Sequence, residues 1–266
     1  MIRMKLRIAT YNIHKGVTSF RGTPRIYALK QALATVEADI LFLQEVQGRH
    51  DRHAVRHAHL WPDEAQHEFL AGDGQHAAYG MNAVYDHGHH GNALLSSYPI
   101  GSSRNQDVSD HAFEQRGILH CVVQTPKVDV HCFVVHLGLF AGGRWRQTQA
   151  LIAAVQASAH QDEPVIIAGD FNDWGNRLGA DLRNRLGVCE VFDEQDTSNP
   201  NSLLHQLGWR KPQIKPARTF PAVLPWLRLD RIYVRGFEVR DAQVLQGSPW
   251  AKLSDHAPIL ATLELS

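Results

Sequence analysis

Short apolar runs of strand length recur along the whole chain of 266 residues. Residues that favour turns, mainly Gly, Pro, Asn and Asp, separate them. The runs that we interpret as strands are LRIATYN, DILFLQE, NALLSS, GILHCVVQ, VDVHCFVVHL, PVIIAGDFN, LDRIYV and APILATLEL. So many strands exclude a helical bundle.

Two segments follow the helical period instead. The first is predicted to begin at Thr23 as the N-cap, with Pro24 supplying a preset φ at the first helical position. Its buried face would carry Ile26, Leu29, Leu33 and Val36. The second covers roughly 143–159, and its buried face would carry Thr148, Leu151, Ile152 and Val155.

Several of the predicted strands are apolar on successive residues, as in DILFLQ and PVIIAG. Such strands are covered on both faces, which predicts an α/β (α+β) fold of two stacked sheets with outer helices. No repeat or linker divides the chain, so we expect one domain over residues 1–266. The segment 193–218 is expected to be a long functional loop.

Charge and cysteine content restrict the possible classes of protein. Lys plus Arg and Asp plus Glu number 27 each, so the chain lacks the bulk positive field of a nucleic-acid coat protein. Cys121, Cys132 and Cys189 have no CxxC spacing and are expected to be reduced and buried. Because no signal peptide or 18-residue apolar run is found, we expect a cytoplasmic protein without a transmembrane segment.

Polar side chains interrupt or end many of the predicted strands. They are Asn12, Glu45, His136, Asp170, Asn172, Asp230, Asp255 and His256. One such residue would be read as a turn former, but a whole set of carboxylates, carboxamides and imidazoles predicts a shared site. Oxygen-rich sets without thiolates suit hard cations such as Mg²⁺ or Mn²⁺. Several buried carboxylates also need a cation to neutralise them, and phosphate ester hydrolysis uses such a cation.

The strings TYNIH, LQEV, VVHLG, AGDFN, LDRIYV and LSDHAP, in this order, resemble the endonuclease/exonuclease/phosphatase superfamily, whose fold is that of the pancreatic-type deoxyribonucleases. The resemblance spans residues 10–258. Longer strings, including NIHKG and HHGNALLS, are similar to its YbhP-like bacterial branch. The resemblance implies a four-layer αββα sandwich of two mostly antiparallel β-sheets flanked by helices. It also implies a metal-dependent phosphoric ester hydrolase.

The resemblance further implies a role for each residue at the strand ends. Glu45 would be the principal ligand of Mg²⁺ or Mn²⁺, supported by Asn12 and Asp255. Asp170 would orient or deprotonate the attacking water, and Asn172 would hold the phosphate. His256 would donate to the phosphoryl oxygen with its tautomer fixed by Asp230, and His136 would lie opposite, near the leaving group.

Two further residues are candidates for substrate binding. Arg116, just before GILHCVV, lies where nucleases of the superfamily often carry a phosphate-contacting Arg, although a surface salt bridge is the alternative. Asn92, next to Gly91, would either contact substrate or fill a β-bulge.

Three other segments are open to two interpretations. The His-rich strings RHDRHAVRHAH and DHGHHG lack the residues that complete a zinc motif, so a solvated loop near the substrate entrance is favoured over a zinc site. The basic string WRKPQIKPAR would either contact substrate phosphate or be solvated. The string FPAVLPWLR would either pack on the core or form an apolar lip for a lipid or an unstacked base.

The leading hypothesis is therefore a phosphodiesterase or nuclease that acts on nucleic acid. A phospholipid or inositol-phosphate phosphoesterase is the alternative enzyme, and a non-catalytic binding module of the same fold is the alternative outside enzymes. Neutral net charge disfavours long duplex DNA as a ligand, because tight binding of the backbone needs many phosphate contacts. No obligate protein partner is inferred.

Overall fold

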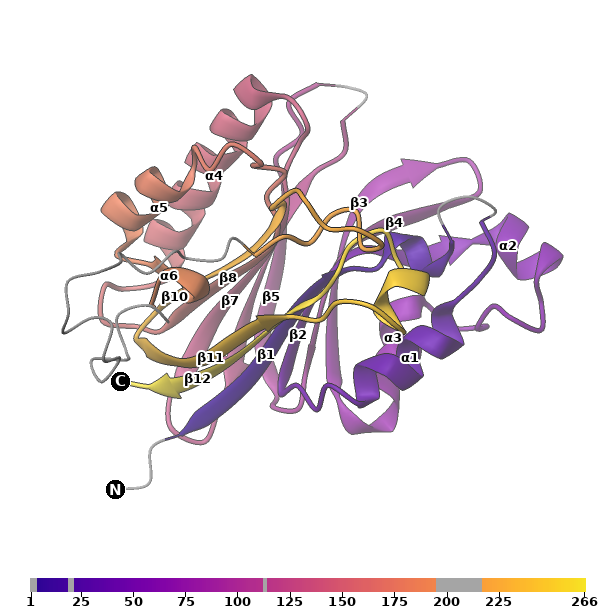
Figure 1. Ribbon diagram of the computed structural model, residues 1–266, viewed down its shortest axis with the longest axis horizontal. Coiled ribbons are helices and arrows are strands. Elements are labelled where there is room, and N and C mark those ends of the chain that lie inside the picture. The colour runs from indigo at the N-terminus through magenta and orange to yellow at the C-terminus, as the bar shows by residue number, and fades with distance from the viewer. Residues whose placement is uncertain (1–3, 19–21, 112–113, 195–216) are drawn as a thin grey trace.

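The computed structural model describes residues 4–18, 22–111, 114–194 and 217–266, and its strands form two stacked six-stranded sheets (Figure 1). The first sheet has the order β11-β12-β1-β2-β4-β3. Its strands are β1 (Lys5–Asn12), β2 (Ile40–His50), β3 (His76–Tyr85), β4 (Gly88–Ser96), β11 (Phe237–Val244) and β12 (Ile259–Leu265).

The second sheet has the order β5-β6-β7-β8-β10-β9. Its strands are β5 (Ile100–Asp107), β6 (Gly117–Gln124), β7 (Asp129–His136), β8 (Val165–Asp170), β9 (Cys189–Glu190) and β10 (Asp230–Arg235). Among the described strands, β1 with β2 and β7 with β8 pair in parallel and the other pairings are antiparallel. The expected sandwich of two mostly antiparallel sheets is confirmed.

Helices form the two outer layers (Figure 1). On the first sheet lie α1 (Ile26–Ala34) and α3 (Gln66–Ala71), and on the second lie α4 (Ala141–Ser158) and α5 (Gly179–Leu186). Shorter helices are α2 (Asp51–Arg56), α6 (Val191–Glu194) and three 3-10 turns at His14–Gly16, Gly72–Gly74 and Trp250–Lys252. None of the described helices combines the length and the apolar character needed to cross a membrane.

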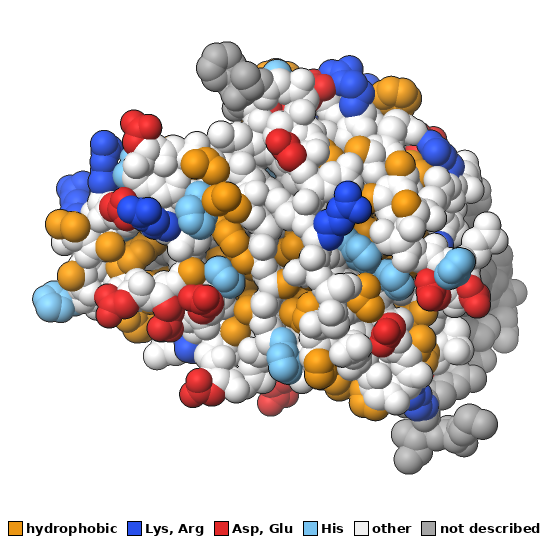
Figure 2. Space-filling view, turned by 180° about the vertical axis from the view of Figure 1, so that it is seen from behind, with side chains coloured by type: hydrophobic (Ala, Val, Ile, Leu, Met, Phe, Trp, Pro, Cys, Tyr) orange, Lys and Arg blue, Asp and Glu red, His pale blue; other side chains and the backbone are white. Residues whose placement is uncertain are grey.

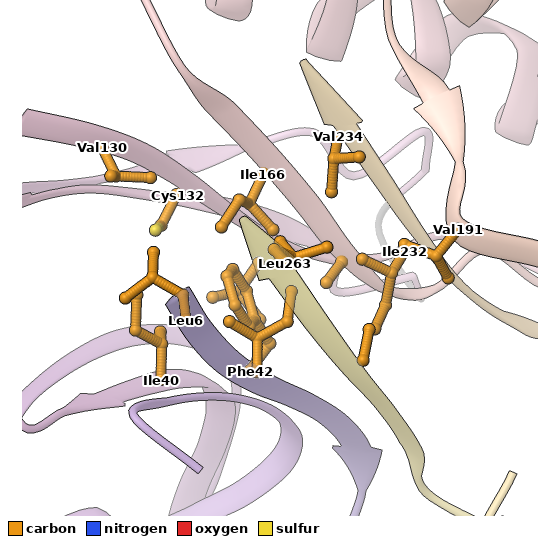
Figure 3. Close-up of a cluster of buried hydrophobic side chains, with 14 of the residues drawn as sticks. Leu6, Ile40, Phe42, Val130, Cys132, Ile166, Val191, Ile232, Val234 and Leu263 are labelled. Carbon is orange, nitrogen blue, oxygen red and sulfur yellow. The ribbon is translucent and has the colours of Figure 1, made fainter. Parts of the chain in front are cut away.

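Alternation along the central strands builds three apolar layers. In β2, Ile40 and Phe42 point into the core between the sheets, while Leu41 and Leu43 pack with α1 and α3. In β8, Ile166 enters the same central core and Ile167 packs against α4 and α5. Figure 3 shows side chains of both sheets meeting in the central core. This two-sided burial explains why these strands are apolar on successive residues.

Some predicted boundaries are wrong. Helix α1 begins at Ile26 rather than near Thr23, because Pro24 pairs with Val17 in an isolated β-bridge and so belongs to the preceding turn. Part of the first His-rich string is the helix α2 rather than a loop. Cys121 and Cys132 are buried as expected, but Cys189 is only half-buried.

The expected functional loop at 193–218 lies mostly outside the described residues, as does most of the basic string within it.

Candidate active site

The strand register gathers the predicted polar residues at one end of the sandwich. Asn12 is the last residue of β1, and His136 and Asp170 are the last residues of β7 and β8. His136 pairs in register with Asp170, which pairs in register with Asp230 at the start of β10. Three adjacent strands therefore present a His, an Asp and an Asp in one row.

Glu45 reaches this end of the sandwich because β2 is irregular there. The pairing of β2 with β4 shifts between Leu43 and Val46, and Glu45 has a φ of 54°. A positive φ is unfavourable for a residue with a Cβ, and such strain is found where a side chain must point in an unusual direction. The bulge turns the Glu45 carboxylate toward the strand ends.

Asp255 and His256 arrive from the segment before β12, which is antiparallel to β1. Ser254 fixes this segment, because its hydroxyl donates to the Asn12 carbonyl at 2.7 Å and accepts from the His256 amide at 3.2 Å. The 3-10 turn at Trp250–Lys252 precedes it. The end of the first strand and the segment before the last strand thus meet at the site.

A pocket of about 270 Å³ opens among these residues. Its polar lining is Asn12, Glu45, Arg116, His136, Asp170, Asn172 and His256. Its apolar lining is Leu139, Trp174, Phe220, Leu227 and Leu229. Of the ten predicted site residues, seven line the pocket. Asp230 and Asp255 lie directly behind it, in contact with His256 and with His14 respectively.

His256 and Asp230 form a buried ion pair. Nδ1 of His256 lies 2.8 Å from Oδ2 of Asp230. Burial by itself would lower the pKa of His256, but the Asp230 carboxylate raises it to about 10. At neutral pH the ring is therefore an imidazolium, whose Nε2–H points toward the pocket at 3.7 Å from Asp170.

Asp170 lies at the centre of the polar set. Its Oδ2 is 3.3 Å from Nδ2 of Asn12 and 3.6 Å from Nε2 of His136, and its Oδ1 accepts from the Asn172 amide. Burial raises the pKa of Asp170, although His256 counteracts this. Burial also lowers the pKa of His136 to about 4, so this ring is uncharged at neutral pH. The two histidines of the site therefore differ in charge.

The structure adds two residues that the sequence analysis missed, His14 and Lys15. Nζ of Lys15 lies 2.9 Å from Oε2 of Glu45, and Nδ1 of His14 lies 3.2 Å from Oδ1 of Asp255 and 4.0 Å from Oε2 of Glu45. Both residues have positive φ values, 47° and 59°. In the sequence these two residues belong to the strings TYNIH and NIHKG, which carry the resemblance but predict no chemistry for them.

Lys15 and His14 explain how Glu45 and Asp255 are tolerated together. Burial opposes the ionisation of Glu45, but His136 and Lys15 hold its pKa well below the ordinary value. Because His136 is uncharged at neutral pH, Lys15 is the cation that acts there. Burial would likewise raise the pKa of Asp255, but the hydrogen bond from His14 lowers it.

The carboxylates are suited to a divalent cation. Oε2 of Glu45 is buried and has no hydrogen bond of good geometry, although Lys15 lies within ion-pair distance. Among the described residues, Asp170, Asp230 and His256 also form a group whose ligand atoms lie within 4.8 Å of one another. We favour the Asn12, Glu45 and Asp255 side of the site for a cation, because an imidazolium such as His256 has no lone pair to donate.

The predicted substrate-binding residues differ in position. Arg116 lines the pocket, and its buried Nε has no partner among the described residues. The Asn172 side chain donates to the Leu137 carbonyl at 2.8 Å at the pocket wall. Asn92 does not line the pocket. It donates to the carbonyls of Gly117 and Val134 and so connects β4 to the opposite sheet.

The His-rich strings form a ring cluster beside α2. The ring of His53 stacks on Trp61 at 4.8 Å, and His50 lies 4.8 Å from His87 between ring centroids. His50 is also the N-cap of α2, because its Nδ1 accepts from the His53 amide. These rings are not among the described groups with close ligand atoms, so the structure adds no support for zinc there.

The ion pair of Lys15 with Glu45 predicts a competition with metal. Replacing Lys15 by Met should lower the Mg²⁺ dissociation constant several-fold, because a nearby unit charge in a partly buried site is worth about 1 kcal/mol or more. Isothermal titration calorimetry with Mg²⁺ measures this constant. Lys5→Met, the same change at the exposed opposite end of β1, should leave it unchanged. Equal constants for Lys15→Met and the parent would show that Lys15 does not compete.

Sequence comparison with known proteins identifies the family of this chain. A sequence model of the Endonuclease/Exonuclease/phosphatase family matches residues 9–256. The protein YbhP of Escherichia coli (strain K12) is 40% identical over 266 residues, which cover 99% of this chain and 98% of YbhP.

Two solved structures illustrate the similarity. The endonuclease/exonuclease/phosphatase from Bacteroides vulgatus has a TM-score of 0.73 at 17% identity, over 99% of this chain and 100% of that chain. The mannosyl-6-phosphatase Bt3783 of Bacteroides thetaiotaomicron has a TM-score of 0.69 at 18% identity, over 97% and 99%. At these identities the likeness concerns the fold alone.

Proposed function

Because the chain belongs to the endonuclease/exonuclease/phosphatase family, whose members are hydrolases that act on phosphoesters, we propose that it is a divalent-metal-dependent phosphodiesterase. The observation that carries the proposal is the position of Asp170. Its carboxylate, with a raised pKa, lies between an uncharged His136 and an imidazolium His256 in the pocket. Few structural roles would require three such groups to be buried together.

Glu45, Asn12 and Asp255 would hold the cation, with Mg²⁺ or Mn²⁺ the expected ion because the donors are hard oxygens. When bound, the ion would supply Lewis-acid polarisation of a phosphoryl oxygen. Before the ion arrives, Lys15 pairs with Glu45 and His14 hydrogen-bonds to Asp255.

The protein groups divide the proton chemistry between them. Asp170 accepts a proton from the attacking water, and its raised pKa makes it a better base than an exposed Asp. His256 donates its Nε2–H to a phosphoryl oxygen, while Asp230 holds the ring in place from the other side. His136, uncharged and 3.6 Å from Asp170, lies toward the leaving group.

Three further residues are proposed to act on the substrate. Arg116 would bind a phosphate oxygen through its guanidinium, which matches phosphate in a bidentate manner. Asn172 holds the pocket wall beside that oxygen. Asn92 would act indirectly by tying β4 to β6, which follows Arg116, and to β7, which carries His136.

Two classes of substrate are proposed. Nucleic acid remains the first, as the sequence predicts. Figure 2 shows acidic and basic side chains interspersed over one face of the molecule, which is typical of proteins without an extended backbone-binding surface on that face. A phospholipid or inositol phosphate is the second, and exposed apolar side chains at the pocket mouth favour a phospholipid. A cytoplasmic location stays a prediction.

A single assay panel tests the proposed activity. Hydrolysis of DNA, RNA, phospholipids, inositol phosphates and an activated aryl phosphodiester is measured with Mg²⁺ or Mn²⁺ and again with EDTA. At least one substrate should be hydrolysed, and EDTA should abolish the reaction. Asp170→Asn should lower kcat on the order of 10²-fold or more, whereas Asp162→Asn on the exposed loop after α4 should not. Turnover that persists in Asp170→Asn would contradict the assignment, and no turnover of any substrate would favour a binding module.

A further inference from the structure

Six large apolar side chains are exposed on three segments that each supply residues to the lining of the pocket. We call this set the apolar rim, and it consists of Leu139, Phe140, Trp174, Val223, Leu224 and Trp226. They come from three segments, the loop after β7, the loop after β8 and the hairpin before β10. The most exposed are Val223 at 80% and Leu224 at 76%. Of twelve exposed large apolar side chains in the described residues, half belong to the rim.

The hairpin is built onto the catalytic wall. Phe220 and Leu227 pair across its base and line the pocket, and the Phe220 ring lies 5.0 Å from that of His256. The Ala222 amide donates to the Asp255 carbonyl at 2.7 Å. The exposed tip, with Leu224 and Trp226, is thereby held in a fixed position relative to the site.

The other two loops are also joined. The guanidinium of Arg144 lies over the Trp174 ring at 4.9 Å and donates to the carbonyls of Gly138 and Leu139. Leu139 and Trp174 both line the pocket. The rim residues therefore belong to segments that line the site and are not scattered over the surface.

The same three segments carry more basic than acidic residues in a chain of balanced charge. Residues 137–146, 171–178 and 217–229 contain the five arginines Arg144, Arg146, Arg177, Arg218 and Arg228. Arg177 and Arg218 are exposed, whereas Arg144 is buried, Arg146 pairs with Asp110 and Arg228 pairs with Glu190. The one acidic residue of these segments is Asp173, which is buried. In the chain as a whole, basic residues (Lys and Arg) and acidic residues (Asp and Glu) number 27 each. Exposed apolar side chains together with exposed arginines, here Arg177 and Arg218, are the composition of a surface that enters the boundary of an anionic bilayer.

We infer that the apolar rim docks the protein on an anionic lipid surface and thereby brings the pocket to a phosphodiester of a phospholipid headgroup. The docking rests on the rim alone. The delivery of the pocket to a headgroup phosphodiester rests on the proposed function. A single-stranded nucleic acid would also bring negative charge, but its bases stack on aromatic rings. Phe140, Trp174 and Trp226 offer such rings, but Leu139 and the two most exposed rim residues, Val223 and Leu224, are aliphatic. These aliphatic side chains cannot stack on bases, whereas they can be buried among acyl chains.

Vesicle sedimentation tests the docking. The full-length protein is mixed with vesicles of phosphatidylglycerol and phosphatidylcholine, and separately with phosphatidylcholine alone. We expect sedimentation with the anionic vesicles and a blue shift of tryptophan emission. Leu224→Ser and Trp226→Ser should each weaken binding about ten-fold, as expected for the loss of one large buried apolar side chain. Leu224→Met, which keeps an apolar side chain, should restore it.

The matched control is Val55→Ser on α2, since Val55 is 84% exposed but is not part of the rim. Absence of vesicle binding, or an equal loss in Val55→Ser and Leu224→Ser, would overturn the inference. Binding of a single-stranded oligonucleotide that requires Trp226 while vesicles are ignored would also overturn it, in favour of nucleic acid. Turnover of a soluble aryl phosphodiester by the parent is measured in parallel. If the parent binds vesicles but does not hydrolyse the aryl phosphodiester, the proposed function is contradicted and the docking surface is retained.

Discussion

Replacing His256 by Ala is expected to lower kcat on the order of 10²-fold or more, and Asp230→Asn should produce a loss of similar size. The reason is their mutual dependence. The Asp230 carboxylate, 2.8 Å from Nδ1, keeps His256 an imidazolium and fixes the direction of its Nε2–H. The double variant should be little worse than the more damaging single variant, because groups that act as a unit lose activity non-additively. An activated aryl phosphodiester is sufficient for the measurement.

His160→Ala is the matched control, because His160 is exposed in the loop after α4 and should not affect kcat. If the losses of the two single variants multiply in the double variant, His256 and Asp230 act independently. Asp230 would then be a separate ligand or a structural residue. Circular dichroism of each variant shows whether a loss of activity reflects a loss of fold.

Glu45→Gln is expected to remove most of the metal-induced stabilisation. A ligand at 100 times its dissociation constant stabilises the folded state by about 2.7 kcal/mol, which corresponds to a rise in Tm of roughly 5 °C or more for a chain of this size. Gln keeps the shape of the side chain but removes the charge that Oε2 offers beside Asn12 and Asp255. The measurement is the Tm with saturating Mg²⁺ minus the Tm with EDTA, for both proteins.

The control for this prediction is Glu64→Gln, which removes one exposed carboxylate outside the pocket and should keep the parent's shift in Tm. An equal shift in Glu45→Gln and the parent would exclude Glu45 as a metal ligand. The Tm without metal is a separate observation, since Lys15 loses its partner in this variant.

Hydrophobic patterning is sufficient to predict the central strands and the two long helices. All eight strands predicted from apolar runs are present, because strands buried on both faces must be apolar on successive residues. The buried positions of α4, which include Leu151, Ile152 and Val155, followed from the helical period. The polar residues at the strand ends were also visible, because each one interrupts an apolar run.

The strands that the sequence analysis missed are β3, β5, β9 and β11, which are the four edge strands of the two sheets. Strand β5 (Ile100–Asp107) has the sequence IGSSRNQD and is exposed over most of its length. An edge strand is paired on one side only and is often solvated, so its residues can be polar without cost to the core. Only the pairing partner, β6 in this case, decides that such a segment is extended.

The composition of the site was likewise decided by the tertiary structure. Sequence position could place Glu45 at a strand, but the bulge in β2 decides where its carboxylate points. The strings NIHKG and FPAVLPWLR carry no periodic signal, yet the first supplies Lys15 to Glu45 and the second supplies half of the apolar rim. Contacts between residues more than 200 positions apart, such as Ser254 with Asn12, depend on how β1 and β12 pair. Local patterns report burial and period, whereas the direction of a side chain and the charge of its neighbours exist only after the strands have paired.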